Sequence, residues 1–227
     1  MLGRLILTPG ERAPIRLERD RIKGLNLYQV RADPTGWLGP HRLEKAARLL
    51  RRRGVGRVLA PEAFPHWDRL QKRGLRPVDP APFLRAQGAQ LALTALEHQG
   101  LAPRQSVVGL CAQRVDRDFT QAARLLAPQV RGLVLCAPSG GEELARQLQW
   151  ELGLPVRPAG EPTPVCLWLG GERPAWGGEV FSLRADGLDL NGFQPRFDEI
   201  TDLPTLAAVW EAGYLPEGKL RFLKIEA

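Results

Sequence analysis

The stretch Val107-Val108-Gly109-Leu110-Cys111 is apolar without interruption, and Leu133-Val134-Leu135-Cys136 has the same character a short distance downstream. A strand with one face in water alternates apolar and polar side chains, whereas a strand that is buried on both faces is apolar throughout. Strands of the second kind belong to parallel sheets that are covered by helices. The two runs therefore predict an α/β protein in which they are hydrogen-bonded neighbours in one sheet.

The residues around these runs repeat an earlier part of the chain. Ala46-Ala47-Arg48-Leu49-Leu50 returns 76 positions later as Ala122-Ala123-Arg124-Leu125-Leu126. An apolar run and a second helical segment follow each copy. We interpret this pattern as one structural unit that is used twice, with pseudo-repeats over about residues 25–80 and 105–157.

Each pseudo-repeat has the predicted order strand, helix, strand, helix, strand, and a helical segment over 82–99 joins the two. This pair of βαβαβ halves resembles the Rossmann-like fold at the level of element order. The resemblance implies one predominantly parallel sheet, with the first strands of the two halves side by side at its centre. Two separate small lobes are the alternative topology. Residues 2–24 are expected to form an irregular or hairpin-like lead-in.

The sequence changes character near Pro158, where short apolar runs with Gly-rich connections begin. The predicted elements are strands at 165–170, 179–184, 187–190 and 220–225, and a helix at 203–211. We interpret this part as an antiparallel C-terminal extension. The expected domains are a Rossmann-like core over 1–157 and a β-rich extension over 158–227.

The predicted sheet indicates where a ligand would bind. Ligands of an open parallel sheet lie outside the carboxyl ends of its strands, at the point where the strand order reverses. Two loops, 31–39 and 113–116, would line that crevice. The candidate ligand-binding residues on these loops are Asp33, Trp37, Gln113, Arg114 and Asp116.

The chemistry of these side chains suits a polar ligand. Arg114 could clamp an anion, and Asp33 or Asp116 could accept hydrogen bonds from hydroxyl groups. Trp37 is either a stacking platform or a lid over the sheet edge. The competing interpretation of the second loop is a capped helix start with solvated charges.

Ser139, Gly140 and Gly141 complete the candidate set, because they follow the second apolar run at the same end of the predicted sheet. Their free amides could hold a carboxylate or a phosphate. The alternative is an ordinary helix start, in which Ser139 is the N-cap and Glu142 completes a capping box.

No cofactor or metal ion is predicted. A dinucleotide site needs a Gly-x-Gly-x-x-Gly turn, because the pyrophosphate approaches bare backbone there. The first loop offers only Gly36 and Gly39, and the second, over 112–118, has no glycine. The three cysteines, Cys111, Cys136 and Cys166, do not have the spacing of a zinc site, and we interpret them as buried, reduced thiols.

Lysine and arginine exceed aspartate and glutamate by 7 over the whole chain. The densest cluster is Arg48 with Arg51-Arg52-Arg53, at the end of a predicted helix. Cations there interact favourably with the helix dipole, and the preference for arginine suggests a GC-rich coding bias. A solvated helix face is therefore one interpretation of the cluster, and a nucleic-acid or acidic protein partner is the other.

Three classes of function stay open. The first is a non-catalytic module, of the pseudoenzyme type, that binds a small anionic ligand or a protein. The second is an enzyme that acts on a small anionic or hydroxylated substrate in the crevice. The third is a basic module that binds nucleic acid or an acidic partner. No apolar run approaches the roughly 20 residues of a membrane span, and the N-terminus lacks a secretory pattern, so we expect a cytoplasmic protein without a membrane partner.

Overall fold

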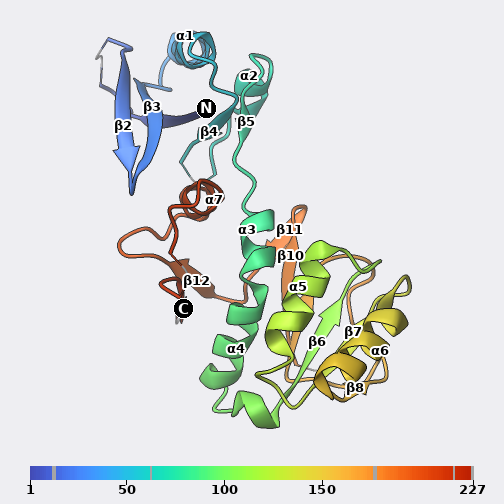
Figure 1. Cartoon of the computed structure of the whole chain (residues 1–227). Helices are drawn as coiled ribbons and strands as arrows, with labels where there is room; N and C mark the ends of the chain where they lie inside the picture. The colour runs from blue at the N-terminus through green and yellow to red at the C-terminus, as the bar shows by residue number, and fades with distance from the viewer. Residues whose placement is uncertain (12–13, 62, 176–177, 217, 226–227) are drawn as a thin grey trace. The chain divides into compact units, whose positions relative to one another are not determined.

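A computed structural model describes residues 1–11, 14–61, 63–175, 178–216 and 218–225 (Figure 1). Strands and helices alternate along the chain, and the strands form largely parallel sheets. This arrangement confirms an α/β, Rossmann-like fold class. The chain divides into two compact units. Unit 1 comprises Met1–Asp79 and Asp202–Glu217, and unit 2 comprises Pro80–Thr201 and Gly218–Ala227.

This division differs from the expected domains, 1–157 and 158–227. The main boundary falls between Asp79 and Pro80, because each pseudo-repeat builds a sheet of its own. The C-terminal part is shared, since one of its segments belongs to unit 1 and the others to unit 2. The two segments that we interpreted as pseudo-repeats therefore lie in different units and not in two halves of one core.

Unit 1 contains a five-stranded sheet with the order β2-β3-β1-β4-β5. Its strands are β1 (Leu2–Leu7), β2 (Leu17–Ile22), β3 (Leu25–Ala32), β4 (Arg57–Leu59) and β5 (Arg76–Pro77). All neighbours are parallel except β2 and β3, which form an antiparallel hairpin. The expected lead-in over 2–24 was therefore only half right: β2 is a hairpin strand, but β1 is the central strand of the sheet.

The described residues of unit 1 include the helices α1 (Gly39–Arg52), α2 (Trp67–Gln71) and α7 (Leu203–Glu211). The predicted apolar stripe of α1 is confirmed, because Leu43, Ala46, Ala47 and Leu50 are buried in one core with residues of the sheet. At roughly 25 cal/mol per Å² of apolar surface, burial of this stripe is the main force that holds α1 in place.

Unit 2 contains a six-stranded sheet with the order β11-β10-β9-β6-β7-β8. Its strands are β6 (Val107–Cys111), β7 (Gly132–Cys136), β8 (Val156–Arg157), β9 (Val165–Trp168), β10 (Glu179–Arg184) and β11 (Gly187–Asp189). The predicted parallel pairing of the two apolar runs is confirmed, in a register from Val107 opposite Gly132 to Cys111 opposite Cys136.

The expected antiparallel extension was wrong for its first two strands. β9 pairs parallel with β6, and β10 pairs parallel with β9, so both extend the main sheet of unit 2. In the C-terminal part, β10 pairs antiparallel with β11, and β12 (Phe193–Arg196) pairs antiparallel with β13 (Arg221–Lys224) in a two-stranded sheet. The apolar character of β9 fits this position, because three of its four residues are buried.

The helices of unit 2 are α3 (Ala81–Ala86), α4 (Gly88–His98), α5 (Arg117–Leu126) and α6 (Gly141–Leu152), with a 3₁₀ turn at Pro103–Gln105. The single helix expected over 82–99 is interrupted before Gly88. A Cβ atom at Gly88 would lie 3.1 Å from Leu183 and 3.2 Å from Leu167, so glycine there lets α4 approach β9 and β10 closely.

The expectation of one sheet with the first strands of both halves at its centre was wrong. β3 and β6 belong to different sheets, as the alternative of separate lobes requires. The halves also differ in strand order, because β1 lies between β3 and β4, whereas β6 pairs directly with β7. The halves therefore share an element order but not a topology.

Candidate functional site

The predicted crevice does not exist as a single site at one sheet. Asp33 and Trp37 follow β3 in unit 1, whereas Gln113 and the other candidates follow β6 and β7 in unit 2. The two groups therefore lie at the carboxyl ends of different sheets. Each group has its own surroundings.

Asp33 is a buried anchor at the carboxyl end of β3, with a side chain that is 5% exposed. Its carboxylate accepts hydrogen bonds from the Thr35 N–H at 2.9 Å, the Thr35 hydroxyl at 2.5 Å and the Gly10 N–H at 3.2 Å. It also pairs with the Arg42 guanidinium at 2.6 Å. These bonds use the oxygen atoms that a ligand hydroxyl would need. Asp33 therefore connects the turn after β1 and the loop after β3 to α1.

The pKa of Asp33 is lowered from its ordinary value of 3.8 to about 2, chiefly by the hydrogen bonds from Thr35. Gly10 and Arg42 contribute to this lowering, and burial opposes it. A carboxyl group with a lowered pKa contributes stability above its unfolded-state pKa and loses it as the pH falls through the folded-state value. The contribution of Asp33 is thus complete above about pH 4 and disappears toward pH 2.

Replacement of Asp33 by asparagine is expected to lower the free energy of unfolding of unit 1 at pH 5 and to lower it much less near pH 2.5. At the lower pH, the Asp33 carboxyl group of the unchanged protein is largely protonated in the unfolded chain, so its ionised form contributes less stability. Urea unfolding of both proteins across this pH range measures the difference in stability. Other carboxylates titrate in both proteins alike, so they cancel from that difference. A difference that stays constant from pH 5 to pH 2.5 would contradict the assigned network.

Trp37 lies on the surface of unit 1 and is 89% exposed. A side chain with so few contacts does not cover a sheet edge, which leaves the lid interpretation without support. The loop that carries it is shaped by Gly36, which has a φ of +71°, and by Gly39, which packs against the Pro34 carbonyl. The two glycines of this loop therefore serve its turn.

In unit 2 the candidate residues lie on two adjoining loops. Gln113 and Arg114 are exposed, and Arg114 forms an isolated parallel bridge with Ser139. The backbone N–H of Val115 donates to the Ser139 carbonyl at 2.9 Å. The structure thus brings Arg114 and Ser139 together at the carboxyl ends of β6 and β7, as the sequence predicted for these two residues.

Asp116 is the N-cap of α5, because its carboxylate accepts a hydrogen bond from the Phe119 N–H at 2.9 Å. A capping side chain satisfies one of the free amides of the first turn. This arrangement matches the alternative interpretation of the loop, a capped helix start. The carboxylate is therefore already engaged within the helix.

The strand order of unit 2 reverses between β6 and β9, so the loops after these strands occupy the switch point. Gly171, with a φ of +77°, lies so close to Gln113 that a Cβ atom would be 3.0 Å from the Gln113 backbone nitrogen. Trp168 donates from its indole N–H to the Gly170 carbonyl at 3.0 Å. The chain itself therefore packs over the position at which a Rossmann-like protein would hold its ligand.

Helix α6 does not begin with the predicted capping box. Its N-cap is Gly140, with a φ of +84°, and no side chain caps the helix. A Cβ atom at Gly140 would also lie 3.3 Å from Val115, which favours glycine here. Glu142 and Glu143 occupy the first turn of α6 and already interact with its dipole. Their negative charge argues against an anion site at Ser139, Gly140 and Gly141.

The cysteines follow the sequence prediction only in part. Cys111 and Cys166 are buried, whereas Cys136 is half-buried. Burial raises the pKa of the Cys111 thiol to about 12 and raises the pKa of Cys166 as well. Thiols with raised pKa values are poor nucleophiles, because the thiolate is the reactive form.

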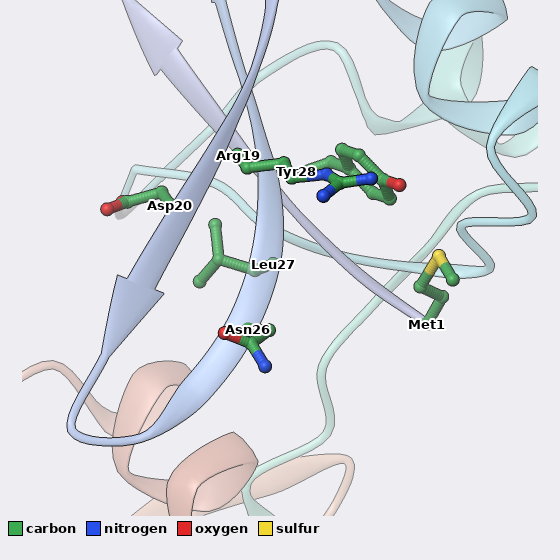
Figure 2. Close-up of a pocket in the computed structure, with 6 residues that line it drawn as sticks. All are labelled: Met1, Arg19, Asp20, Asn26, Leu27 and Tyr28. Carbon is green, nitrogen blue, oxygen red and sulfur yellow. The ribbon is translucent and has the colours of Figure 1, made fainter.

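One hollow lies away from the predicted loops, and another begins at the predicted loop 113–116, where Asp116 lines it. One, of about 340 Å³, is in unit 1 at the starts of β1 and β3 (Figure 2), and its lining residues are Met1, Arg19, Asp20, Asn26, Leu27 and Tyr28. Figure 2 shows the Arg19 side chain beside the ring of Tyr28, its cross-strand partner. The other, of about 610 Å³, is an open hollow along α5 from Val115 to Leu125. Sequence reasoning missed the first because it depends on the position of β1.

The charges are distributed unequally between the units. Unit 1 contains 18 lysines and arginines against 11 aspartates and glutamates, a net charge of +7, whereas unit 2 contains 14 of each. The formal charge of the whole chain therefore belongs to unit 1. This difference in net charge can be counted from the sequence, but only once the boundary between the units is known.

Helix α1 contributes much of this charge. Lys45, Arg48 and Arg52 are exposed, and their spacing of three and four residues places them on one side of the helix. We refer to these three residues as the basic stripe. The carboxylate of α1, Glu44, pairs instead with Arg69 and Arg73. No carboxylate in the described part of the chain pairs with the basic stripe.

The end of α1 agrees in part with the solvated helix face that the sequence suggested. Arg51 donates to the Val55 carbonyl at 3.2 Å, so its guanidinium supports the turn after the helix. Arg52 and Arg53 are exposed. The cluster is thus partly structural, and the basic stripe is the portion of α1 that stays available to a partner.

In the described residues, no helix has both the length and the apolar character that a membrane crossing requires. The same residues contain no group of three or more His, Cys, Asp and Glu side chains that could hold a metal ion.

Comparison with known proteins adds little to this description. No protein family profile matches the chain, and no curated protein matches it. Among solved structures, it is similar to the crystal structure of L-tryptophan dehydrogenase from Nostoc punctiforme, with 12% identity and a TM-score of 0.33. The match covers 75% of this chain and 57% of that one, so the chain spans somewhat more than half the length of that enzyme. A TM-score this low carries no argument about fold or function.

Proposed function

We propose that this protein acts by binding nucleic acid through unit 1, as a binding module and not as an enzyme. The observation that carries the proposal is the unequal distribution of net charge, which is +7 for unit 1 and zero for unit 2. A coding bias toward arginine would act on both units alike, so it does not account for the difference. A basic face of this kind attracts phosphate groups and releases their counterions.

The basic stripe supplies the contacts. Lys45, Arg48 and Arg52 extend over about 10 Å along the axis of α1, given a rise of about 1.5 Å per residue. Glu44 does not oppose this contact, because Arg69 and Arg73 neutralise it. The cations are therefore free to exchange water for phosphate oxygens.

The catalytic alternative lacks its acid and base. The enzyme hypothesis needed Asp33 or Asp116 to exchange a proton with a substrate. Asp33 is held by Thr35, Gly10 and Arg42, and Asp116 caps α5. Both carboxylates thus have structural partners that a substrate would have to displace. This supports a role in binding over a role in catalysis.

Neutralisation of the basic stripe tests the proposal. The triple variant Lys45→Gln, Arg48→Gln, Arg52→Gln is expected to bind a labelled single-stranded DNA or RNA roughly 100-fold more weakly at about 50 mM salt. The loss of three phosphate contacts also makes the negative slope of log K against log salt shallower by about 2 for a single strand. Fluorescence anisotropy at salt concentrations from about 50 to 200 mM measures both quantities.

The matched control removes the same amount of charge from unit 2, at the exposed residues Arg104, Arg131 and Arg146. This variant is expected to bind like the unchanged protein. Equal weakening in both triple variants would show non-specific charge attraction and would overturn the proposal. So would an unchanged protein that binds an acidic peptide but no nucleic acid.

A further inference from the structure

An exposed tryptophan lies in the turn before α1, the helix that carries the basic stripe. Trp37 precedes the helix, and the positions 37, 41, 45, 48 and 52 are separated by four, four, three and four residues. Within α1 (Gly39–Arg52) this spacing places positions 41, 45, 48 and 52 on one side of the helix, and Trp37 lies in the turn just before it. His41 is also exposed. One side of α1 thus presents an imidazole and three cations, and an exposed aromatic side chain lies in the turn at the start of this helix.

The loop that carries Trp37 is held firmly although the side chain has few contacts. Asp33 binds Thr35 within the loop and Arg42 within α1. Gly39 donates from its backbone N–H to the Gly36 carbonyl at 3.0 Å. Exposure of a large apolar side chain contributes nothing to folding, yet the backbone around it is well anchored. Such pre-organisation favours binding, because little entropy is lost when a partner arrives.

We infer that Trp37 stacks on an unpaired base and that the basic stripe therefore binds single-stranded nucleic acid in preference to duplex. This inference rests on the proposed function. Every base has a π-face, so an exposed indole stacks on any of them once the strand is unpaired. In a duplex those faces are covered by neighbouring base pairs. Cations beside an aromatic platform are the usual combination in single-strand binding.

A second exposed tryptophan provides a contrast. Trp150 on α6 is 91% exposed. Its helix, however, contains three glutamates and one arginine, whereas α1 contains five lysines and arginines and one glutamate. Phosphates are repelled from α6 and attracted to α1. Trp150 is thus equal to Trp37 in exposure and opposite in electrostatic surroundings.

The experiment compares Trp37→Ala, Trp37→Phe and the control Trp150→Ala in the full chain. The ligands are a labelled single-stranded DNA of about 20 nucleotides, longer than the roughly 4–16 nucleotides of a typical site, and the matching duplex. We expect Trp37→Ala to weaken single-strand binding by roughly 10-fold and to leave the salt slope unchanged. Trp37→Phe should retain most of the affinity, and Trp150→Ala should bind as the unchanged protein does.

The outcomes separate this inference from the proposed function. Single-strand binding that depends on the basic stripe but is the same in Trp37→Ala overturns the inference and leaves the proposed function in place. Equal affinity for duplex and single strand in the unchanged protein has the same consequence. Absence of any nucleic-acid binding overturns both. Circular dichroism of each variant shows whether the fold is intact, and surface positions such as these are expected to leave it so.

Discussion

Replacement of Phe119 by alanine is expected to lower the free energy of unfolding of unit 2 by about 4 kcal/mol. Phe119 is fully buried on the inner side of α5, which packs against α3 and α4. The change removes the transfer free energy of the ring and leaves a cavity that the surrounding helices fill only in part. Urea unfolding monitored by circular dichroism measures the loss.

Leu125 provides the control on the same helix. Its side chain is 45% exposed, so Leu125→Ala removes few contacts and is expected to cost less than about 1 kcal/mol. Alanine has the highest helix propensity, so helix propensity accounts for neither loss. Comparable losses in the two variants would show that α5 does not pack as described.

Local patterns in the sequence predicted the local structure well. The apolar runs Val107–Cys111 and Leu133–Cys136 are neighbouring parallel strands, and the helix predicted over 203–211 has the observed bounds of α7. Both depend on interactions between residues near in sequence, or on burial that the residue types themselves indicate. The alternation of strands and helices is visible for the same reason.

The strand order was not predictable from the same patterns. β1 lies between β3 and β4, and β9 pairs with β6. The strands in each of these pairings are not close in sequence. Such pairings depend on tertiary packing, which apolar runs do not specify. The expectation of a single sheet failed for that reason, and the expected crevice failed with it.

The site residues show the same division. The capping role of Asp116 follows from its position before a helix, and the sequence already offered that alternative. The contact of Asp33 with Thr35 is local, but its contact with Gly10, which lies 23 residues away, could not be predicted from the sequence pattern. Similarly, Lys45 and Arg52 stand out as a candidate binding surface only because unit 2 has no net charge. The boundary expected from the sequence lay at a different place, so it did not reveal this contrast between the units.

Replacement of Gly39 by alanine is expected to destabilise unit 1 by roughly 3 kcal/mol. A Cβ atom at this position would lie 2.0 Å from the Pro34 carbonyl oxygen and 2.5 Å from its carbonyl carbon. Both atoms belong to the backbone, so the clash is relieved only if the loop from 34 to 38 moves away from α1. Urea unfolding of the variant measures the loss, and Gly56→Ala is the control.

Gly56 lies in the same unit, does not require a positive φ, and has no atom within 4 Å of the position that a Cβ atom would occupy. Alanine there is expected to be neutral or slightly stabilising, by up to about 1 kcal/mol, because it restricts the unfolded chain. Equal stabilities of the two variants would mean that the loop yields to a methyl group without cost. The expected difference instead makes Gly39 the residue that fixes the loop against α1, and thereby the position from which Trp37 reaches solvent.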